Sequence, residues 1–149
     1  MNPSCQLFLK DGLVYVFSEA VLANTRARTT GDLTAKYPED VDSNALGREI
    51  RAALRSFGGA RTLDQSKADA PFRQIEGFTS MKKLMKNLGD VRVSEDGDKK
   101  YLRMQPMKSQ GKNSISIAGE KKDLLLECPD SELGAEALRL LKLSQDVNS

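Results

Sequence analysis

Histidine and tryptophan are both absent from the 149 residues of this chain. Without histidine, the chain lacks the commonest general base, the commonest activator of a nucleophile and the commonest zinc ligand. The glycine-rich phosphate-binding motifs GxxxxGK[ST] and GxGxxG and the nucleophile motif GxSxG are absent as well. Without tryptophan, a protein-binding surface has to use Tyr, Phe, Met or Arg as its anchors. We therefore expect no enzymatic activity and no catalytic residues.

Cysteine is scarce, and long apolar runs are missing. The two cysteines, Cys5 and Cys128, lie in or beside apolar runs, where a free cysteine usually behaves as a small hydrophobic residue. They do not make a disulfide framework, and two distant cysteines cannot form a zinc site alone, so we expect no metal and no cofactor. No apolar run approaches the ~20 residues that span a bilayer, and the first residues do not resemble a signal peptide. These features predict a cytoplasmic protein with no membrane partner.

The N-terminal part of the sequence predicts a β-hairpin. Asp11-Gly12 separates two apolar runs in QLFLKDGLVYVFSE, and Asp-Gly in that position is a strong signal for a tight turn. Both alternating sets of residues in the second run are apolar, which predicts a strand covered on both faces: Leu13, Tyr15 and Phe17 in one set, Val14 and Val16 in the other.

The spacing of apolar residues and of capping residues predicts three helices, at about 43–57, 80–88 and from 131 onward. Residues 60–71 are polar and rich in turn-forming residues, which predicts the longest loop. Short alternating segments between the second and third helices predict strands. We therefore predict a single α+β domain of residues 1–149, in which about three helices pack on a mostly antiparallel or mixed sheet of five to seven strands.

The first and third helices share one pattern, SNALGREIRAALRSF in the first and SELGAEALRLLKLS in the third. Each has Leu-Gly followed two residues later by Glu. A glycine one turn into a helix costs about 1 kcal/mol relative to alanine. Two glycines at matching positions, Gly47 and Gly134, predict that each helix packs closely against a strand or another backbone, where a Cβ would collide. The pattern also indicates a weak internal similarity between residues 1–59 and 90–149.

Charge is spread unevenly although the net charge is only +2. Residues 78–122 carry eleven basic and five acidic side chains, a balance of +6, whereas residues 123–149 carry two basic and six acidic side chains, a balance of −4. Solvated faces of opposite sign are one interpretation of this distribution, and a polar surface that binds a partner is the other.

The order of these features resembles the immunity proteins of bacterial contact-dependent growth inhibition systems. The resemblance extends from about Leu7 to Ser144, and its most specific parts are the SNALGREIRAAL helix, the FTSMKKL helix with its lysines and the DSELG opening of the last helix. It implies a small cytoplasmic antitoxin without enzymatic activity, which binds one to one to the C-terminal toxin domain delivered by a neighbouring cell. The toxin in such a system is often a nuclease acting on tRNA or DNA.

If the toxin is a nuclease, its substrate cleft should be basic, and carboxylates would complement it. We therefore predict partner contacts in the two acidic segments that precede the first and third helices, which would share one edge if the two halves are related. The predicted residues are Tyr37, Glu39, Asp40, Asp42, Glu127, Asp130 and Glu132. Capping and solubility are the competing explanation, and they are preferred for Asp42 and Asp130.

Three alternatives stay open at the level of sequence. The basic segment 82–122 is the rival interface, suited to a toxin with an acidic surface. The same segment supports a small nucleic-acid-binding or adaptor protein. It lacks the interleaved aromatic residues of RNA-binding sheets, so no direct contact with nucleic acid is expected. The acidic stretches YPEDVD, SEDGD and ECPDSE support an enzyme that works without histidine, although each lies where caps and turns favour carboxylates anyway.

Overall fold

The computed structural model describes residues 2–23, 25, 27–58, 60–61, 71–111 and 113–149. The strands are β1 (Ser4–Lys10), β2 (Leu13–Leu22), β3 (Arg28–Pro38), β4 (Ala60–Arg61), β5 (Gly89–Asp96), β6 (Tyr101–Gln110), β7 (Asn113–Ser116) and β8 (Lys122–Leu125). The helices are α1 (Ser43–Arg55), the 3₁₀-helix η1 (Pro71–Gln74), α2 (Met81–Met85) and α3 (Asp130–Val147).

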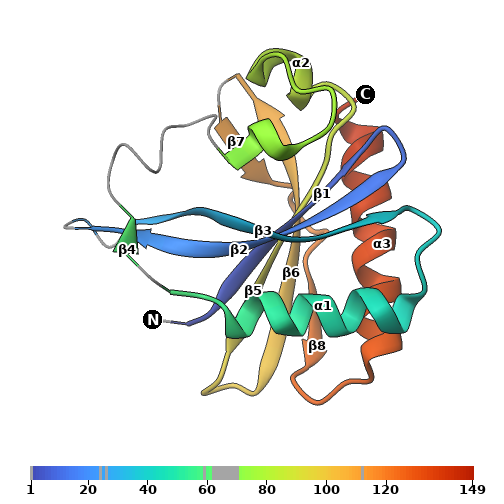
Figure 1. The fold of residues 1–149 in the computed structure, drawn as a ribbon. Helices are drawn as coiled ribbons and strands as arrows, with labels where there is room; N and C mark the ends of the chain where they lie inside the picture. Colours follow the sequence, from blue (N-terminus) through green and yellow to red (C-terminus); the bar gives the residue numbers. More distant parts are fainter. Residues whose placement is uncertain (1, 24, 26, 59, 62–70, 112) are drawn as a thin grey trace.

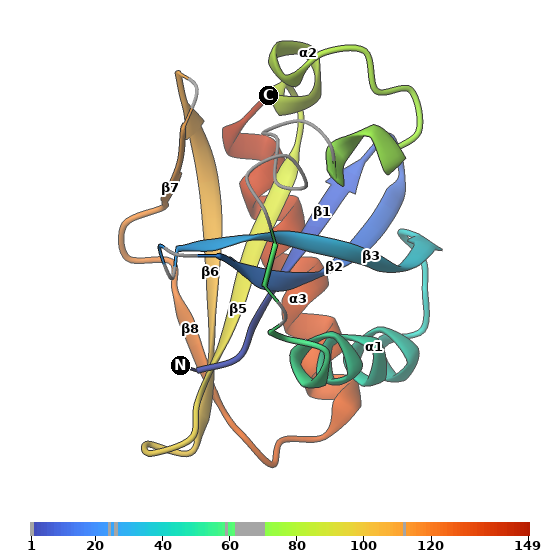
Figure 2. The ribbon, with the colours of Figure 1, turned by 60° about the vertical axis from the view of Figure 1, so that its left-hand side comes forward.

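The described strands form one sheet in the order β3-β2-β1-β5-β6-β7, with β4 added to β2 and β8 added to β6. The strand pairs are antiparallel except for the short parallel pair of β2 and β4. The sheet is strongly twisted, since β2 and β3 run across the direction of β5 and β6 (Figures 1 and 2). The predicted α+β fold is confirmed, and β4 adds a two-residue strand to the seven longer ones.

β1 and β2 form the predicted hairpin. Asp11 and Gly12 have φ angles of 50° and 78°, the positive values that a two-residue hairpin turn requires. The register pairs Lys10 with Leu13 across this turn. β2 is buried on both faces through most of its length, as the apolar run predicts.

The first face of the sheet is covered by α1 and α3, which cross in front of it (Figure 1). Alternate residues of β1 (Cys5, Leu7 and Leu9) point to this face and are fully buried. They pack with the apolar stripes that the sequence predicts for the two helices. These stripes are Leu46, Ile50, Ala53 and Leu54 in α1, and Leu133, Ala137, Leu140 and Leu141 in α3.

The crossing of α1 and α3 explains the repeated glycines. A Cβ on Gly47 would lie 1.9 Å from the carbonyl oxygen of Asp130, and a Cβ on Gly134 would lie 1.9 Å from that of Ser43. Each glycine therefore allows its helix to touch the N-terminal backbone of the other. The predicted close approach to a backbone is confirmed, and the two matching positions are the two sides of one contact.

The second face of the sheet is covered by η1 and α2 over only part of its area. Phe8 of β1 and Tyr15 and Phe17 of β2 point to this face and pack with Ile75 and Leu84. The rings of Phe8 and Phe17 meet edge to face with their centroids 5.6 Å apart, and the backbone N–H of Glu76 donates to the Tyr15 hydroxyl at 3.0 Å. The rest of the second face is not covered by η1 or α2.

Two local predictions need correction. The second helix spans only Met81–Met85 instead of residues 80–88, because Asn87 has a φ of 57° and Gly89 already belongs to β5. A Cβ on Gly89 would lie 2.5 Å from the carbonyl oxygen of Leu141, so this glycine makes room for α3. The predicted loop 60–71 begins with a strand, since β4 pairs with Val21 and Leu22, and its residues 62–70 lie outside the described part.

Helix length and hydropathy decide whether a helix can cross a membrane. Among the helices in the described residues, none is both long enough and apolar enough to cross a bilayer.

Candidate functional site

The second face of the sheet changes from apolar to polar along its strands. In β1, Phe8 packs beneath η1, whereas Ser4 and Gln6 on the same face carry polar groups. In β2, Glu19 follows Phe17 on that face and is only 3% exposed. We call the polar part of the second face, formed by the starts of β1 and β3, the end of β2 and the facing residues of β5 and β6, the polar half.

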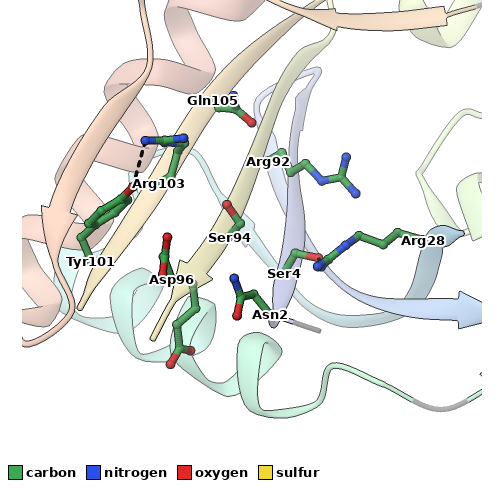
Figure 3. A pocket seen from close by; sticks show the side chains of 10 residues that line it. Asn2, Ser4, Arg28, Arg92, Ser94, Asp96, Tyr101, Arg103 and Gln105 are labelled. Atoms are coloured by element: carbon green, nitrogen blue, oxygen red, sulfur yellow. Dashed lines mark hydrogen bonds between the residues drawn. The ribbon is translucent and has the colours of Figure 1, made fainter. Parts of the chain in front are cut away.

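A concavity of about 350 Å³ lies on the polar half (Figure 3). Its walls include Ser4 of β1, Arg28 of β3, Arg92 and Ser94 of β5, and Arg103 and Gln105 of β6. The antiparallel register places these residues side by side, because Ser94 pairs with Ser4 on one side and with Arg103 on the other. Arginines from three strands therefore surround one hollow.

Arg92 is held by a buried carboxylate. Its Nε and Nη2 atoms donate to the two oxygens of Glu19 at 3.2 and 3.0 Å. The Glu19 side chain is 4% exposed, whereas the Arg92 side chain is 35% exposed. The guanidinium therefore covers the carboxylate and is itself partly exposed to solvent. Such a bidentate pair fixes the plane of the guanidinium.

Arg103 is fixed at the opposite wall of the concavity. Its Nε donates to Asp123 at 3.0 Å and its Nη2 donates to the Tyr101 hydroxyl at 3.0 Å. The guanidinium carbon also lies 5.4 Å from the centre of the Tyr101 ring, within the range of a cation–π contact. The hydrogen bonds from Arg103 lower the pKa of Asp123, so this carboxylate stays ionised.

Arg28 lies on the third side. Its Nη1 donates to the Ser4 hydroxyl, and its guanidinium carbon lies 4.9 Å from the centre of the Phe57 ring, just beyond the end of α1. Figure 3 shows the Arg92 side chain extending from β5 toward Arg28. Burial lowers the pKa of Arg28, the nearby positive charge of Arg92 lowers it further, and Glu19 opposes both.

A line of hydrogen bonds crosses the sheet beside these arginines. Thr30 of β3 donates to the Gln6 side chain at 3.3 Å, and Gln6 donates to Asp90 of β5 at 3.1 Å. Ser114 of β7 donates to the other oxygen of Asp90 at 2.8 Å. Burial raises the pKa of Asp90 to about 6, against the lowering effect of the Ser114 and Gln6 hydrogen bonds. The polar half therefore contains a line of hydrogen-bonded polar side chains as well as charged groups that are held in place.

The concavity presents polar groups that can bind a partner. Within the described ranges, no group of three or more His, Cys, Asp or Glu residues is placed to hold a metal ion. In the same part of the chain, every buried side-chain nitrogen or oxygen has a hydrogen-bond partner. The concavity offers guanidinium, hydroxyl and amide groups that already have defined positions, which suits recognition of a charged surface.

The two helices that follow the predicted acidic segments meet near their starts, where α1 and α3 cross. The contacts of Gly47 with Asp130 and of Gly134 with Ser43 place the N-terminal turns of the two helices side by side. We call these two helix starts and the segments that lead into them the acidic corner, and the name covers the seven predicted contact residues: Tyr37, Glu39, Asp40, Asp42, Glu127, Asp130 and Glu132.

Three of these residues have structural roles. Asp42 caps α1 by accepting a hydrogen bond from the Ala45 N–H at 3.2 Å, and Asp130 accepts one from the Arg51 Nε at 2.7 Å. Tyr37 is half-buried against the core, and this burial raises its pKa. The other four, Glu39, Asp40, Glu127 and Glu132, are exposed, as is Asp42.

The basic segment 82–122 does not form one patch. Lys82 and Lys83 lie in α2, at one end of the molecule, whereas Lys99 and Lys100 lie in the β5–β6 turn at the other end (Figures 1 and 2). The same segment contributes Arg92, Ser94, Arg103 and Gln105 to the polar half.

The sequence reasoning did not single out Glu19, Arg28 or Arg92. One signal was present, because Glu19 interrupts the apolar run of β2, and a charged residue inside a buried strand needs a partner. The identity of that partner could not be read from the sequence, since Glu19 and Arg92 are 73 residues apart.

Comparison with known proteins defines the fold only. No family model and no curated protein matches the sequence. A solved structure described as a protein of unknown function from Neisseria meningitidis is similar, with a TM-score of 0.68 and 16% sequence identity. The similarity covers 95% of this chain and 93% of that one, so the two proteins share a similar fold over nearly their full lengths.

Proposed function

We propose that this protein is an immunity protein of a contact-dependent growth inhibition system, which acts in the cytoplasm and neutralises a toxin domain by one-to-one binding. The resemblance in the order of sequence features is one support. The structural observation that carries the proposal is the polar half, where Arg28, Arg92 and Arg103 surround one concavity on the part of the sheet that η1 and α2 leave open.

The polar half has the properties of a preorganised protein-binding surface. Arginine and tyrosine are enriched among the residues that dominate binding energy. Because Glu19 holds Arg92, and Asp123 holds Arg103, less side-chain entropy is lost when a partner binds. The concavity is lined by both signs of charge, since Glu95 and Asp96 lie among the arginines. Mixed charge of this kind selects one partner and disfavours others.

The exposed carboxylates of the acidic corner are proposed as a second contact, for a basic part of the toxin. Glu39, Asp40, Glu127 and Glu132 are free to take this role in space, because they lie on the surface. Asp42 and Asp130 would contribute through the helix ends that they stabilise.

The direct test uses the coding sequence upstream of this gene. Its C-terminal domain is expressed in bacteria alone and together with this protein, viable cells are counted, and the two proteins are run together on size-exclusion chromatography. We expect killing by the domain alone, rescue by this protein and co-elution at a one-to-one ratio. A domain that is harmless, or one that kills despite this protein, would contradict the proposal.

A charge-reversal pair sharpens the test. Arg103→Glu changes the polar half, and Arg48→Glu makes the same charge change at an exposed position of α1. The proposal expects loss of rescue with Arg103→Glu and full rescue with Arg48→Glu. Glu39→Lys combined with Asp40→Lys tests the acidic corner in the same assay.

A further inference from the structure

Arg28 differs from the other two arginines of the concavity in what it contacts. Arg92 and Arg103 each form a bidentate pair with a carboxylate. Within the described residues, Arg28 forms no ion pair, and its contacts are the Ser4 hydroxyl and the Phe57 ring. These two contacts fix the position of the guanidinium and do not neutralise it.

The surroundings of Arg28 favour the arrival of a negative charge. A guanidinium has five N–H donors, and the hydrogen bond to Ser4 uses only one of them. Arg92 extends from β5, across β1 and β2, toward Arg28 of β3 and adds a second positive charge (Figure 3). Two partly desolvated cations that line one concavity repel each other, and an anion between them would remove that repulsion.

We propose that the concavity binds a carboxylate side chain, an Asp or Glu of the partner protein, between Arg28 and Arg92. The Ser94 hydroxyl on β5 and the Gln105 amide on β6 line the same concavity and would bind the polar backbone beside that side chain. The identity of the partner as a protein rests on the proposed function. Glu19, beneath Arg92, is a positioning residue for this site because it fixes the plane of the Arg92 guanidinium.

The charge of the surroundings selects a carboxylate over a phosphate. Glu95 and Asp96 line the same concavity, and the buried Glu19 lies behind Arg92. A single negative charge balances Arg28, whereas a doubly charged phosphate or a nucleic-acid backbone would meet these carboxylates as well. A carboxylate also matches the planar guanidinium fork.

The test titrates the protein with N-acetyl-glutamate amide and follows the backbone amides and the arginine Nε–H groups by NMR. N-acetyl-glutamine amide is the neutral isostere, and inorganic phosphate is the competing anion. Arg28→Gln removes the charge at the site, and Arg48→Gln is the matched control on α1. We expect saturable shifts at Ser4, Arg28 and Arg92 with the glutamate probe.

The expected differences are large. The glutamine probe, and the glutamate probe with Arg28→Gln, should each bind about tenfold more weakly or worse, because a charge-assisted hydrogen bond is lost. Arg48→Gln should bind the glutamate probe as the unmodified protein does. Equal binding of the two probes to the unmodified protein would overturn the proposal, and so would tighter binding of phosphate than of glutamate.

A second arm separates this inference from the proposed function. The affinity of the toxin domain is measured for the unmodified protein, Arg28→Gln and Arg48→Gln. A tenfold loss confined to Arg28→Gln supports the site. A toxin complex that is unaffected by Arg28→Gln overturns the site and leaves the immunity function standing. A glutamate site without any toxin complex contradicts the immunity function and confirms the carboxylate chemistry.

Discussion

The two faces of the sheet are formed by the same strands, but one carries apolar side chains and the other carries polar and charged ones. On the face under α1 and α3, the side chains of β1 are uniformly apolar, and both helices approach so closely that only glycine fits at Gly47 and Gly134. On the other face, β1 changes from Phe8 to Gln6 and Ser4, and buried charges appear. The face under α1 and α3, which we call the helical face, is closely packed with apolar side chains, whereas the polar half contains buried polar groups.

This difference is the reason for proposing the polar half as the binding surface. A buried carboxylate such as Asp90 destabilises the fold relative to a neutral isostere, and a buried ion pair such as Glu19–Arg92 is rarely better than apolar packing. Departures from efficient packing concentrate at functional sites. The four predictions below test the contrast between the two faces.

The largest effect is expected on the helical face. Gly47→Ala and Gly134→Ala should each destabilise the protein by about 3 kcal/mol or more, because the new Cβ collides with a backbone carbonyl that cannot move alone. Helix propensity alone would give the opposite sign, a gain of about 1 kcal/mol. Gly97→Ala is the control, since nothing lies within 4 Å of a Cβ there. If denaturant unfolding gives the same free energy of unfolding for all three variants, the close helix crossing is refuted.

Asp90 gives the polar half a distinct pH dependence. Its pKa is raised from 3.8 to about 6 in the folded state, so the folded protein holds the proton more tightly, and stability falls as pH rises from about 4 to about 6. Asp90→Asn should remove this slope and stabilise the protein above pH 6 by up to about 3 kcal/mol, because an amide can still accept from Gln6 and donate to Ser114.

The measurement for Asp90 is denaturant unfolding at a series of pH values. Asp98→Asn, at an exposed carboxylate of the β5–β6 turn, is the control and should keep the slope of the unmodified protein. An Asp90→Asn variant that is less stable than the unmodified protein at pH 8 would show that the buried carboxylate stabilises the polar half.

The Glu19–Arg92 pair should have an intermediate effect. Arg92→Gln leaves the Glu19 carboxylate buried without its partner and should cost about 2 kcal/mol, less than a fully buried pair because Arg92 is partly exposed. The double variant Glu19→Gln/Arg92→Gln should recover part of the loss. Arg139→Gln breaks the surface pair with Glu136 on α3 and should cost under about 0.5 kcal/mol. If denaturant unfolding gives equal losses of stability for Arg92→Gln and Arg139→Gln, the expected difference between the buried pair and the surface pair is contradicted.

The smallest effect concerns Asn148, which links the end of α3 to the sheet. Its side chain accepts from the Ser109 N–H at 2.9 Å and donates to the Leu88 carbonyl at 2.7 Å. Asn148→Ala should cost about 1 kcal/mol and speed hydrogen exchange at the Ser109 amide. Ser149→Ala, which loses only a bond to Asp146, is the control. Unchanged exchange at Ser109 would show that the link is unimportant.

Local patterns in the sequence predict the helices, strands and turns well, but they predict poorly which elements contact each other and which residues form the surface. The turn at Asp11-Gly12, the stripes of α1 and α3 and the special role of Gly47 and Gly134 all follow from short-range rules, and the structure confirms them. The repeated glycines predicted a close backbone contact but not that the partner of each helix is the other helix. That step depends on tertiary packing.

The candidate site could not be predicted in the same way. The polar half combines Ser4, Glu19, Arg28, Arg92 and Arg103, which lie on five different strands. Apart from Glu19, which interrupts the apolar run of β2, each of these residues alone fits an ordinary solvent-facing strand position. The acidic corner could be proposed from sequence, because its residues lie in two short segments, each just before a predicted helix, and the starts of these helices meet in the structure.

The arginines themselves allow the most direct test of the account. Arg28, Arg92 and Arg103 lie on the polar half, whereas Arg48, Arg51 and Arg139 lie on α1 and α3. We would add the unlabelled toxin domain to the ¹⁵N-labelled protein and record the shifts of the arginine Nε–H signals. The account predicts the largest shifts at Arg28, Arg92 and Arg103. Shifts confined to Arg48, Arg51 and Arg139 would contradict it and move the binding surface to the helical side.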